Sequence, residues 1–251
     1  EVSLDDEQTI TKQRRPLSRN GLVWRRLRGM PRFWVGAIAF ATIVLLSIVG
    51  PFLTPWSITD RDVYNMGMGP TLRHWFGTNS IGQDIFAQTM AGLQKSLIIG
   101  LVAGILGTLL AAVIGSVAGY VGGVTDKVIS WFTHLLLVVP SFFILVLLSP
   151  LFKSLSWIAL TFFLAIFSWM IMAQVVRNQT RSLRNRDFVR AARYMGLPTR
   201  KILSRHILPN IASLLIIDVT LGIVSMIMSE TSLSYFGFGV QKPDVSLGTL
   251  L

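Results

Sequence analysis

Residues 97–121 read LIIGLVAGILGTLLAAVIGSVAGYV, a stretch of 25 residues without a charged side chain. The hydrocarbon core of a bilayer is about 30 Å thick, so a helix of about 20 apolar residues crosses it. Four further segments are also long and mainly apolar, namely residues 33–53, 129–148, 157–176 and 207–229. Five such segments predict an all-α, polytopic membrane protein.

The composition of the whole chain supports this prediction. Of its 251 residues, 52% are hydrophobic and 14% are charged, whereas soluble domains average about 25% charged residues. The chain has no cysteine, which excludes disulfides and thiolate metal sites. Its net charge of +11 would suit nucleic acid, but the positions of the cations point to a membrane instead.

The Lys and Arg residues are unevenly divided between the segments that join the predicted spans. Eight of the 23 lie in residues 1–32 and nine in residues 177–206, whereas the segment 54–96 holds three. Cytoplasmic loops of membrane proteins carry the excess of positive charge. We therefore predict a cytoplasmic N-terminus, a basic tail over 1–32 with a short amphipathic helix at 19–32, a cytoplasmic elbow at 177–206 and an extracytoplasmic segment at 54–96.

Small residues form two unbroken rows in the second predicted span. Each row steps by four residues, so its members share one face of a helix. Small residues let helix backbones approach closely in a membrane, where contact area must supply the affinity. The span is therefore predicted to be central to the bundle. The rows are Gly100, Gly104, Thr108, Ala112 and Ser116, and Gly107, Ala111, Gly115 and Gly119.

The basic segment 177–206 is predicted to form two short helices joined by a turn. The first helix covers Val189–Met195 and is stopped by Gly196, Leu197 and Pro198, and the second covers about Thr199–Leu208. DNA-binding motifs share this outline, but a DNA reader is not expected between two membrane helices. The remaining alternatives are a purely structural anchor and a docking element for another subunit.

The elbow resembles the Glu-Ala-Ala loop of ATP-binding-cassette importer permeases. In that family Glu-Ala-Ala is followed by three residues and Gly, and later by an apolar pair before Pro. This chain matches the pattern except at Arg190, where the family usually has Glu. The resemblance implies a type I importer permease whose elbow couples to an ATPase subunit. The implied coupling residues are Arg190, Ala191, Ala192, Gly196, Leu197, Pro198, Arg205 and Pro209.

Further stretches over about residues 20–251 are similar to second-subunit permeases of the dipeptide and oligopeptide branch. The segment His74–Thr78 and the motif Gly122-Gly123 fit that branch, whereas Gln83, Gln94 and His134 depart from it. The resemblance implies a bacterial inner-membrane importer of peptides, with nickel or glutathione as alternative substrates. It also implies four kinds of partner: a homologous permease, two ATPase subunits that use ATP and Mg²⁺, an extracytoplasmic substrate-binding protein and membrane lipid.

Nothing in the sequence indicates an enzyme. The chain has no Walker-type glycine loop with Lys and Ser/Thr, so ATP would be hydrolysed in a partner subunit. We predict no cofactor in this chain, and no metal site either. The histidines His74, His134 and His206 fall in different predicted compartments, and His134 is interpreted as a hydrogen-bond donor between helices.

Asp218 is a carboxylate inside the last predicted span. Unpaired charge is costly there, and intramembrane ionisable groups are functional by default. Asp218 shares one helical face with Ser225 and Ser229, which predicts the polar wall of a translocation path. The alternatives are a packing stripe and, less well supported, an ion-coupled secondary transporter with its ionisable group at the membrane midplane.

Residues 230–250 are predicted to form a short interfacial helix and a turn. In the resembled family this region precedes one more membrane helix. We therefore expect a sixth span beyond Leu251.

Overall fold

The computed structural model describes residues 27–152 and 156–251. The chain divides into two compact units between Leu46 and Ser47. Within the described residues the structure is helical, apart from irregular segments and one isolated β-bridge between Thr78 and Asp84. The all-α fold class is therefore confirmed. The amphipathic helix expected at 19–32 falls mostly on residues outside the described ones.

Four helices of the described part are long and apolar enough to cross a membrane. They are α2 (Pro31–Val49, continued by the 3₁₀ turn η1, Gly50–Phe52), α3 (Ile85–Val121), α6 (Trp157–Arg184) and α9 (Ala212–Tyr235). A fifth crossing results if α4 (Gly123–Val138) and α5 (Ser141–Phe152) form one bent span. Most of α2 belongs to the first compact unit, and the other helices belong to the second.

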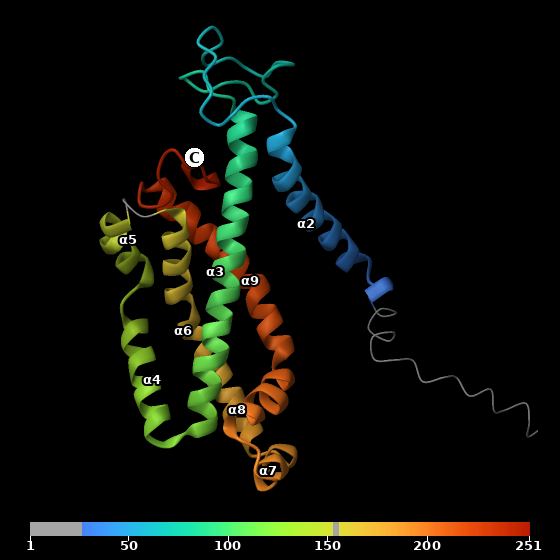
Figure 1. Ribbon diagram of the computed structural model, residues 1–251, viewed down its shortest axis with the longest axis vertical. Helices are drawn as coiled ribbons and strands as arrows, with labels where there is room; N and C mark the ends of the chain where they lie inside the picture. Colours follow the sequence, from blue (N-terminus) through green and yellow to red (C-terminus); the bar gives the residue numbers. More distant parts are fainter. Residues whose placement is uncertain (1–26, 153–155) are drawn as a thin grey trace, which may run out of the picture. The chain divides into compact units, whose positions relative to one another are not determined.

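Helix α3 is the centre of the second unit, with α6 and α9 packed along it (Figure 1). Its 37 residues begin at Ile85, earlier than the span expected from Leu97. The side chain of Asp84 caps the first turn by accepting a hydrogen bond from the backbone N–H of Ala87 at 3.2 Å. Carboxylates suit this position because the first N–H groups of a helix have no partner within it. The extra turns carry α3 beyond the length that a bilayer requires.

The two rows of small residues in α3 face two different helices. A Cβ added at Gly100 or Gly104 would meet Ile223 or Ile227 of α9, so this row lies against α9. A Cβ added at Gly115 would press on the backbone of Ala173 in α6, and the rest of the second row follows the same helix. Because the rows have no bulky side chains, both neighbours approach the α3 backbone closely.

The third predicted span, 129–148, is not one straight helix. The structure has α4 and α5 instead, bent by 77° at the break between them. Val139 is extended there, with φ −88° and ψ 120°, and Pro140 follows it. A proline ring disfavours the helical conformation of the residue before it, which explains the break at this position.

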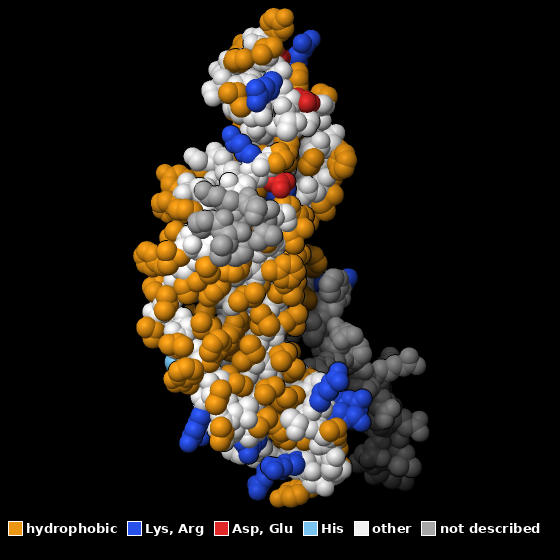
Figure 2. Space-filling model, turned by 60° about the vertical axis from the view of Figure 1, so that its left-hand side comes forward, with side chains coloured by type: hydrophobic (Ala, Val, Ile, Leu, Met, Phe, Trp, Pro, Cys, Tyr) orange, Lys and Arg blue, Asp and Glu red, His pale blue; other side chains and the backbone are white. Residues whose placement is uncertain are grey.

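Helix α6 continues past the expected end of its span at residue 176 and reaches Arg184. The elbow then consists of α7 (Asp187–Tyr194), α8 (Thr199–Ile202), the π-turn η2 (Leu203–Ile207) and the 3₁₀ turn η3 (Leu208–Asn210), before α9 begins at Ala212. We call this part of the second unit its elbow end. Figure 2 shows hydrophobic side chains over the middle of one face of the bundle and Lys and Arg gathered at the elbow end.

The opposite end of α3 carries a compact cap formed by residues 53–84, which we call the loop end (Figure 1). His74 is its buried centre. The ring lies between two carboxylates, with Nδ1 3.3 Å from Asp84 and Nε2 3.5 Å from Asp62, and it stacks on Trp56 at 4.6 Å between centroids. This long irregular segment is thus held by polar contacts around one histidine.

Candidate functional site

The elbow is positioned by one buried face of α7. Val189 and Ala192 are fully enclosed by an apolar cluster that includes Tyr120 of α3 and Ile202 and Ile207 of the following turns. Position 189 is followed by 192 on the same helical face, because residues three apart lie side by side. The short helix is therefore packed against the last turn of α3.

Gly196 ends α7 in a left-handed conformation, with φ 76°. Its N–H donates to the carbonyl of Arg193 at 3.0 Å, and the N–H of Leu197 donates to the carbonyl of Ala192 at 3.2 Å. These two bonds form a Schellman motif, which satisfies carbonyl groups that the helix leaves open. Pro198, which has no backbone N–H, is the N-cap residue of α8. The turn expected at Gly196, Leu197 and Pro198 is therefore present, and these three residues form it.

The coupling residues expected from the sequence fall into two groups in the structure. Ala192 belongs to the buried cluster, and Leu197 is half-buried beside it, so these two hold the elbow together. The others present their side chains or backbone to the exterior: Arg190, Ala191, Gly196, Pro198, Arg205 and Pro209.

An exposed apolar stripe on α7 was missed by the sequence analysis. Phe188, Ala191 and Met195 follow each other at spacings of three and four, so they share one face of the helix. Met195 is 71% exposed and Phe188 is 42% exposed. The stripe could have been recognised in the sequence, because Phe188 and Ala191 each lie one position before Val189 and Ala192, the residues that face the core.

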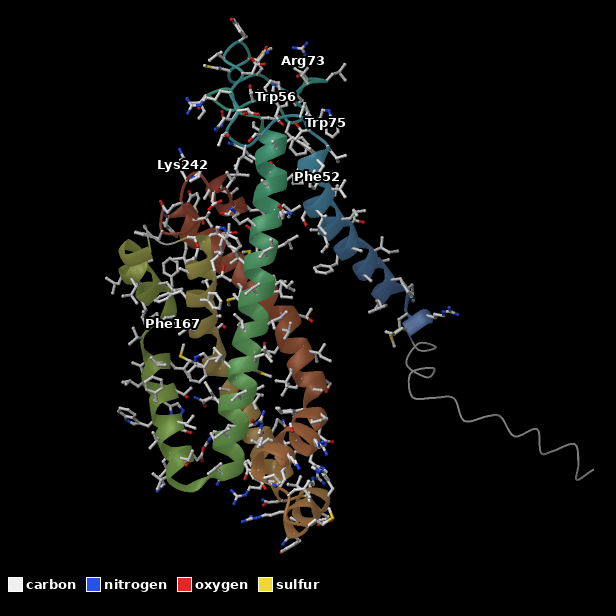
Figure 3. The ribbon with its side chains drawn as sticks, viewed as in Figure 1. Phe52, Trp56, Arg73, Trp75, Phe167 and Lys242 are labelled. Carbon is white, nitrogen blue, oxygen red and sulfur yellow. The ribbon has the colours of Figure 1, made fainter. Side chains whose placement is uncertain are left out.

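A cavity of about 520 Å³ lies within the membrane part, between α3, α6 and α9. Asp218 of α9 and Thr108 of α3 line it, and the Thr108 hydroxyl donates a hydrogen bond of 2.6 Å to the Asp218 carboxylate. Phe167 of α6 also lines it, and Figure 3 labels this side chain. The cavity is mainly apolar, so the carboxylate is its strongest polar feature.

The other two residues of the predicted polar row behave differently. Ser225 lines the cavity but donates its hydroxyl proton to the carbonyl of Leu221 at 3.0 Å. Ser229 is not part of the lining, and its hydroxyl bonds the carbonyl of Ser225 at 2.8 Å. The row is therefore no chain of hydrogen bonds to Asp218, because each serine is bonded within α9.

A second acidic residue of α9, Glu230, was also missed. It is fully buried and accepts hydrogen bonds from Ser96 of α3 at 3.0 Å and from Ser234 at 2.6 Å. Ser96 accepts the backbone N–H of Leu247 at 3.1 Å as well. The network thus ties the segment after α9, with its 3₁₀ turn η4 (Leu247–Thr249), to α3. Glu230 could have been singled out in the sequence, because it is a carboxylate at the end of the apolar segment 207–229.

The loop end holds an open pocket of about 420 Å³ lined by Trp56, Arg73 and Trp75, which Figure 3 labels. Asp62 lies in the same cap, outside the membrane helices. The pKa of this carboxyl is held below its usual value, first because the Asn65 side chain donates a hydrogen bond of 2.8 Å to it. A lowered pKa means that this stabilisation is present when Asp62 is ionised and is lost as the pH falls through that pKa.

Within residues 27–152 and 156–251, no three His, Cys, Asp or Glu side chains lie close enough to hold a metal ion. His74 is committed to its two carboxylates in the loop-end cap.

Comparisons with known proteins agree with this architecture. Residues 111–251 match the sequence profile of the binding-protein-dependent transport system inner membrane component, and residues 18–70 match that of the N-terminal TM domain of oligopeptide transport permease C. The chain is 46% identical to the oligopeptide transport system permease protein OppC of Mycobacterium tuberculosis, over 93% of this chain and 81% of that protein.

Two more distant relatives have similar names. The chain is 38% identical to OppC of Escherichia coli strain K12, over 85% of this chain and 71% of that protein. It is 31% identical to the dipeptide transport system permease protein DppC of Bacillus subtilis, over 90% of this chain and 71% of that protein. These matches cover both the membrane helices and the elbow, so the chain belongs to the family of inner membrane components of binding-protein-dependent transport systems, in the branch of oligopeptide permease C.

Proposed function

We propose that this chain is one membrane-spanning subunit of an ATP-driven importer of peptides. The observation that carries the proposal is the 46% identity to an oligopeptide permease over 93% of this chain. The elbow supports it, since α7 is a short helix packed at one end of the bundle that carries an exposed apolar stripe. The subunit performs no chemistry itself and alternates between two states that its partners bias.

The proposed orientation places the elbow end in the cytoplasm and the loop end outside. The excess of Lys and Arg in the tail and in residues 177–206 supports this orientation. ATPase subunits would then bind at the elbow, a substrate-binding protein would deliver peptide at the loop end, and a homologous permease would form the other half of the path.

Two regions of this chain have separate roles in the proposed function. The stripe of Phe188, Ala191 and Met195 would enter a groove of the ATPase subunit, as amphipathic helices do in other complexes. The cavity with Asp218 would form part of the translocation path. A displacement of α7 reaches the cavity through α3, because Tyr120 in the last turn of α3 packs on α7 and Thr108 of the same helix bonds Asp218.

Reconstitution of the whole transporter tests the proposal. The chain, its permease partner and the ATPase subunits are placed in proteoliposomes with ATP inside and peptide-loaded binding protein outside. Labelled peptide should accumulate only with ATP present. Accumulation that follows an imposed proton gradient and continues without ATP would mean a secondary transporter instead.

The α7 stripe has its own test. Phe188→Asp with Met195→Asp places charge in an apolar contact, so the ATPase subunits should no longer co-purify with the chain. The control is Leu72→Asp, which places the same charge on an exposed apolar residue at the loop end, away from the elbow. If the doubly substituted chain retains its ATPase subunits as well as the control does, the stripe is not the docking surface.

A further inference from the structure

The cavity between α3, α6 and α9 has one charged side chain in its lining, that of Asp218. The remaining lining residues are apolar, are glycines or carry a hydroxyl group. Among residues 27–152 and 156–251, no Lys, Arg or His lines the cavity or forms an ion pair with Asp218. A carboxylate in apolar surroundings is costly unless an opposite charge compensates it. The cavity therefore favours a cation as its occupant.

The three hydroxyl groups of the lining have already committed their protons. Thr108 donates to the Asp218 carboxylate at 2.6 Å. Ser168 and Ser225 donate to backbone carbonyls of their own helices, at 2.9 Å and 3.0 Å. A hydroxyl has one proton but two lone pairs, and an ionised carboxylate only accepts. The polar side chains that face the cavity can thus receive hydrogen bonds from an occupant, and none of them has a proton left to donate.

Glycines leave room for these acceptors and for an occupant. A Cβ at Gly107 would lie 2.0 Å from the hydroxyl oxygen of Ser168, so this hydroxyl takes its place because residue 107 has no side chain. Gly104 and Gly222 line the cavity as well. Its volume of about 520 Å³ is within the range of about 300–1,000 Å³ that small-molecule sites span. One end of a short peptide has space there.

We propose that this cavity binds the primary ammonium group of the cargo, with Asp218 as its counter-charge. An ammonium group is a cation with three N–H donors and no acceptor, which matches a lining of one carboxylate and hydroxyl oxygens. A peptide carries such a group at its amino terminus or on a Lys side chain, whereas its carboxyl terminus has the wrong charge. The inference rests on the proposed transport function and adds which part of the cargo this chain recognises.

The first test is ATP-driven uptake of three peptides by the reconstituted complex. They are Ala-Gln-Ala, its N-acetylated form and N-acetylated Ala-Lys-Ala, each supplied as its complex with the binding protein. Asp218→Asn should lower the uptake of Ala-Gln-Ala roughly tenfold, since a charge-assisted hydrogen bond is lost, and should leave that of the acetylated form unchanged. If the uptake of acetylated Ala-Lys-Ala falls too, a Lys side chain also supplies the ammonium group.

Two control variants separate charge from structure. Asp218→Glu keeps the negative charge and should preserve most of the preference for the free amino terminus. Asp60→Asn makes the same change as Asp218→Asn on an exposed carboxylate outside the cavity, and should leave the preference as it is. The binding protein is the same in every sample, so its own preference cancels when the variants are compared.

A second measurement needs neither the binding protein nor a folded variant. The purified complex is treated with dicyclohexylcarbodiimide and trialanine methyl ester. The carbodiimide activates the carboxyl group of Asp218, the peptide amine displaces it as a urea, and an amide bond forms. Peptide mapping by mass spectrometry should find this adduct at Asp218, and should not find one with N-acetylated trialanine methyl ester.

The results distinguish this inference from the proposed function. An equal fall in the uptake of free and acetylated Ala-Gln-Ala in Asp218→Asn, or the absence of an adduct at Asp218, would overturn the inference and leave the transport function standing. If the unsubstituted complex took up none of the peptides with ATP, the proposed function would be wrong, and the inference about its cargo with it.

Discussion

At Gly196 the backbone turns with φ 76°, and no atom lies within 4 Å of the place where a Cβ would be. Space is therefore available for a side chain, but the conformation disfavours one. A residue with a Cβ costs about 1–2 kcal/mol in the left-handed region. The effect of a substitution would thus come from the backbone of the turn and not from a clash.

Gly196→Val should consequently leave assembly in the membrane intact and reduce the ATP hydrolysis that substrate stimulates. The reason is that a distorted turn displaces α7 from α8 without unfolding the bundle. The control is Gly69→Val, which also has no neighbour within 4 Å but lacks a positive φ. The measurement is substrate-stimulated ATP hydrolysis by the reconstituted complex. Normal stimulation in Gly196→Val would show that this turn has no part in the coupling mechanism.

Asp218 offers a second test at the scale of one residue. Asp218→Asn keeps an oxygen that can accept the Thr108 hydrogen bond but removes the charge from the cavity. We expect peptide uptake to fall by on the order of tenfold, equivalent to about 1.4 kcal/mol in a barrier, while the amount of folded chain in the membrane is unchanged. Uptake equal to that of the unsubstituted chain would show that the carboxylate only packs helices.

At the scale of elements, the contact between α3 and α6 is the closest in the bundle. A Cβ at Gly115 would press on the backbone of Ala173, which cannot rotate away as a flexible side chain could. Gly222 in α9 differs, because a Cβ there would meet only the Cα of Gly104 at 3.7 Å, an ordinary contact distance. Substitution by alanine is therefore expected to destabilise the protein at Gly115 but not at Gly222.

Gly115→Ala should lower the thermal unfolding temperature of the purified chain, because overpacking a tight contact costs about 1–3 kcal/mol. Gly222→Ala should be tolerated, or should stabilise its helix slightly, since alanine is the better helix former. Thermal unfolding of both variants in the same detergent makes the comparison direct. Equal unfolding temperatures for the two would mean that α3 and α6 are less closely packed than the structure has them.

The membrane orientation belongs to the scale of the whole molecule. The chain has no cysteine, so a single introduced thiol reports one position. Leu72 is 98% exposed at the loop end, and Arg200 is exposed at the elbow end. In spheroplasts with a sealed inner membrane, a membrane-impermeant maleimide should label Leu72→Cys. It should label Arg200→Cys only after the membrane is permeabilised. The reverse pattern would invert the proposed orientation.

Several features were predictable because they depend on neighbours along the chain. The all-α membrane architecture followed from the length of the apolar segments, and the family followed from the elbow motif, and both are confirmed. The turn at Gly196 depends on two hydrogen bonds within six residues. The kink at Pro140 also depends on neighbouring residues alone, so the prediction of one straight span over 129–148 overlooked a local signal.

The order of residues along the chain was therefore enough to predict a helical membrane subunit of a known transport family, with a turn at Gly196. Helix packing was needed to show that one small-residue row of α3 faces α9 and the other α6, that Thr108 donates a hydrogen bond to Asp218, and that Ser96 donates one to Glu230. The physical reason is that lipid-facing and protein-facing surfaces are both apolar, so hydrophobic periodicity does not determine how a membrane helix is rotated. Partners separated by 110 residues, such as Thr108 and Asp218, are set by that rotation and by the depth of each helix.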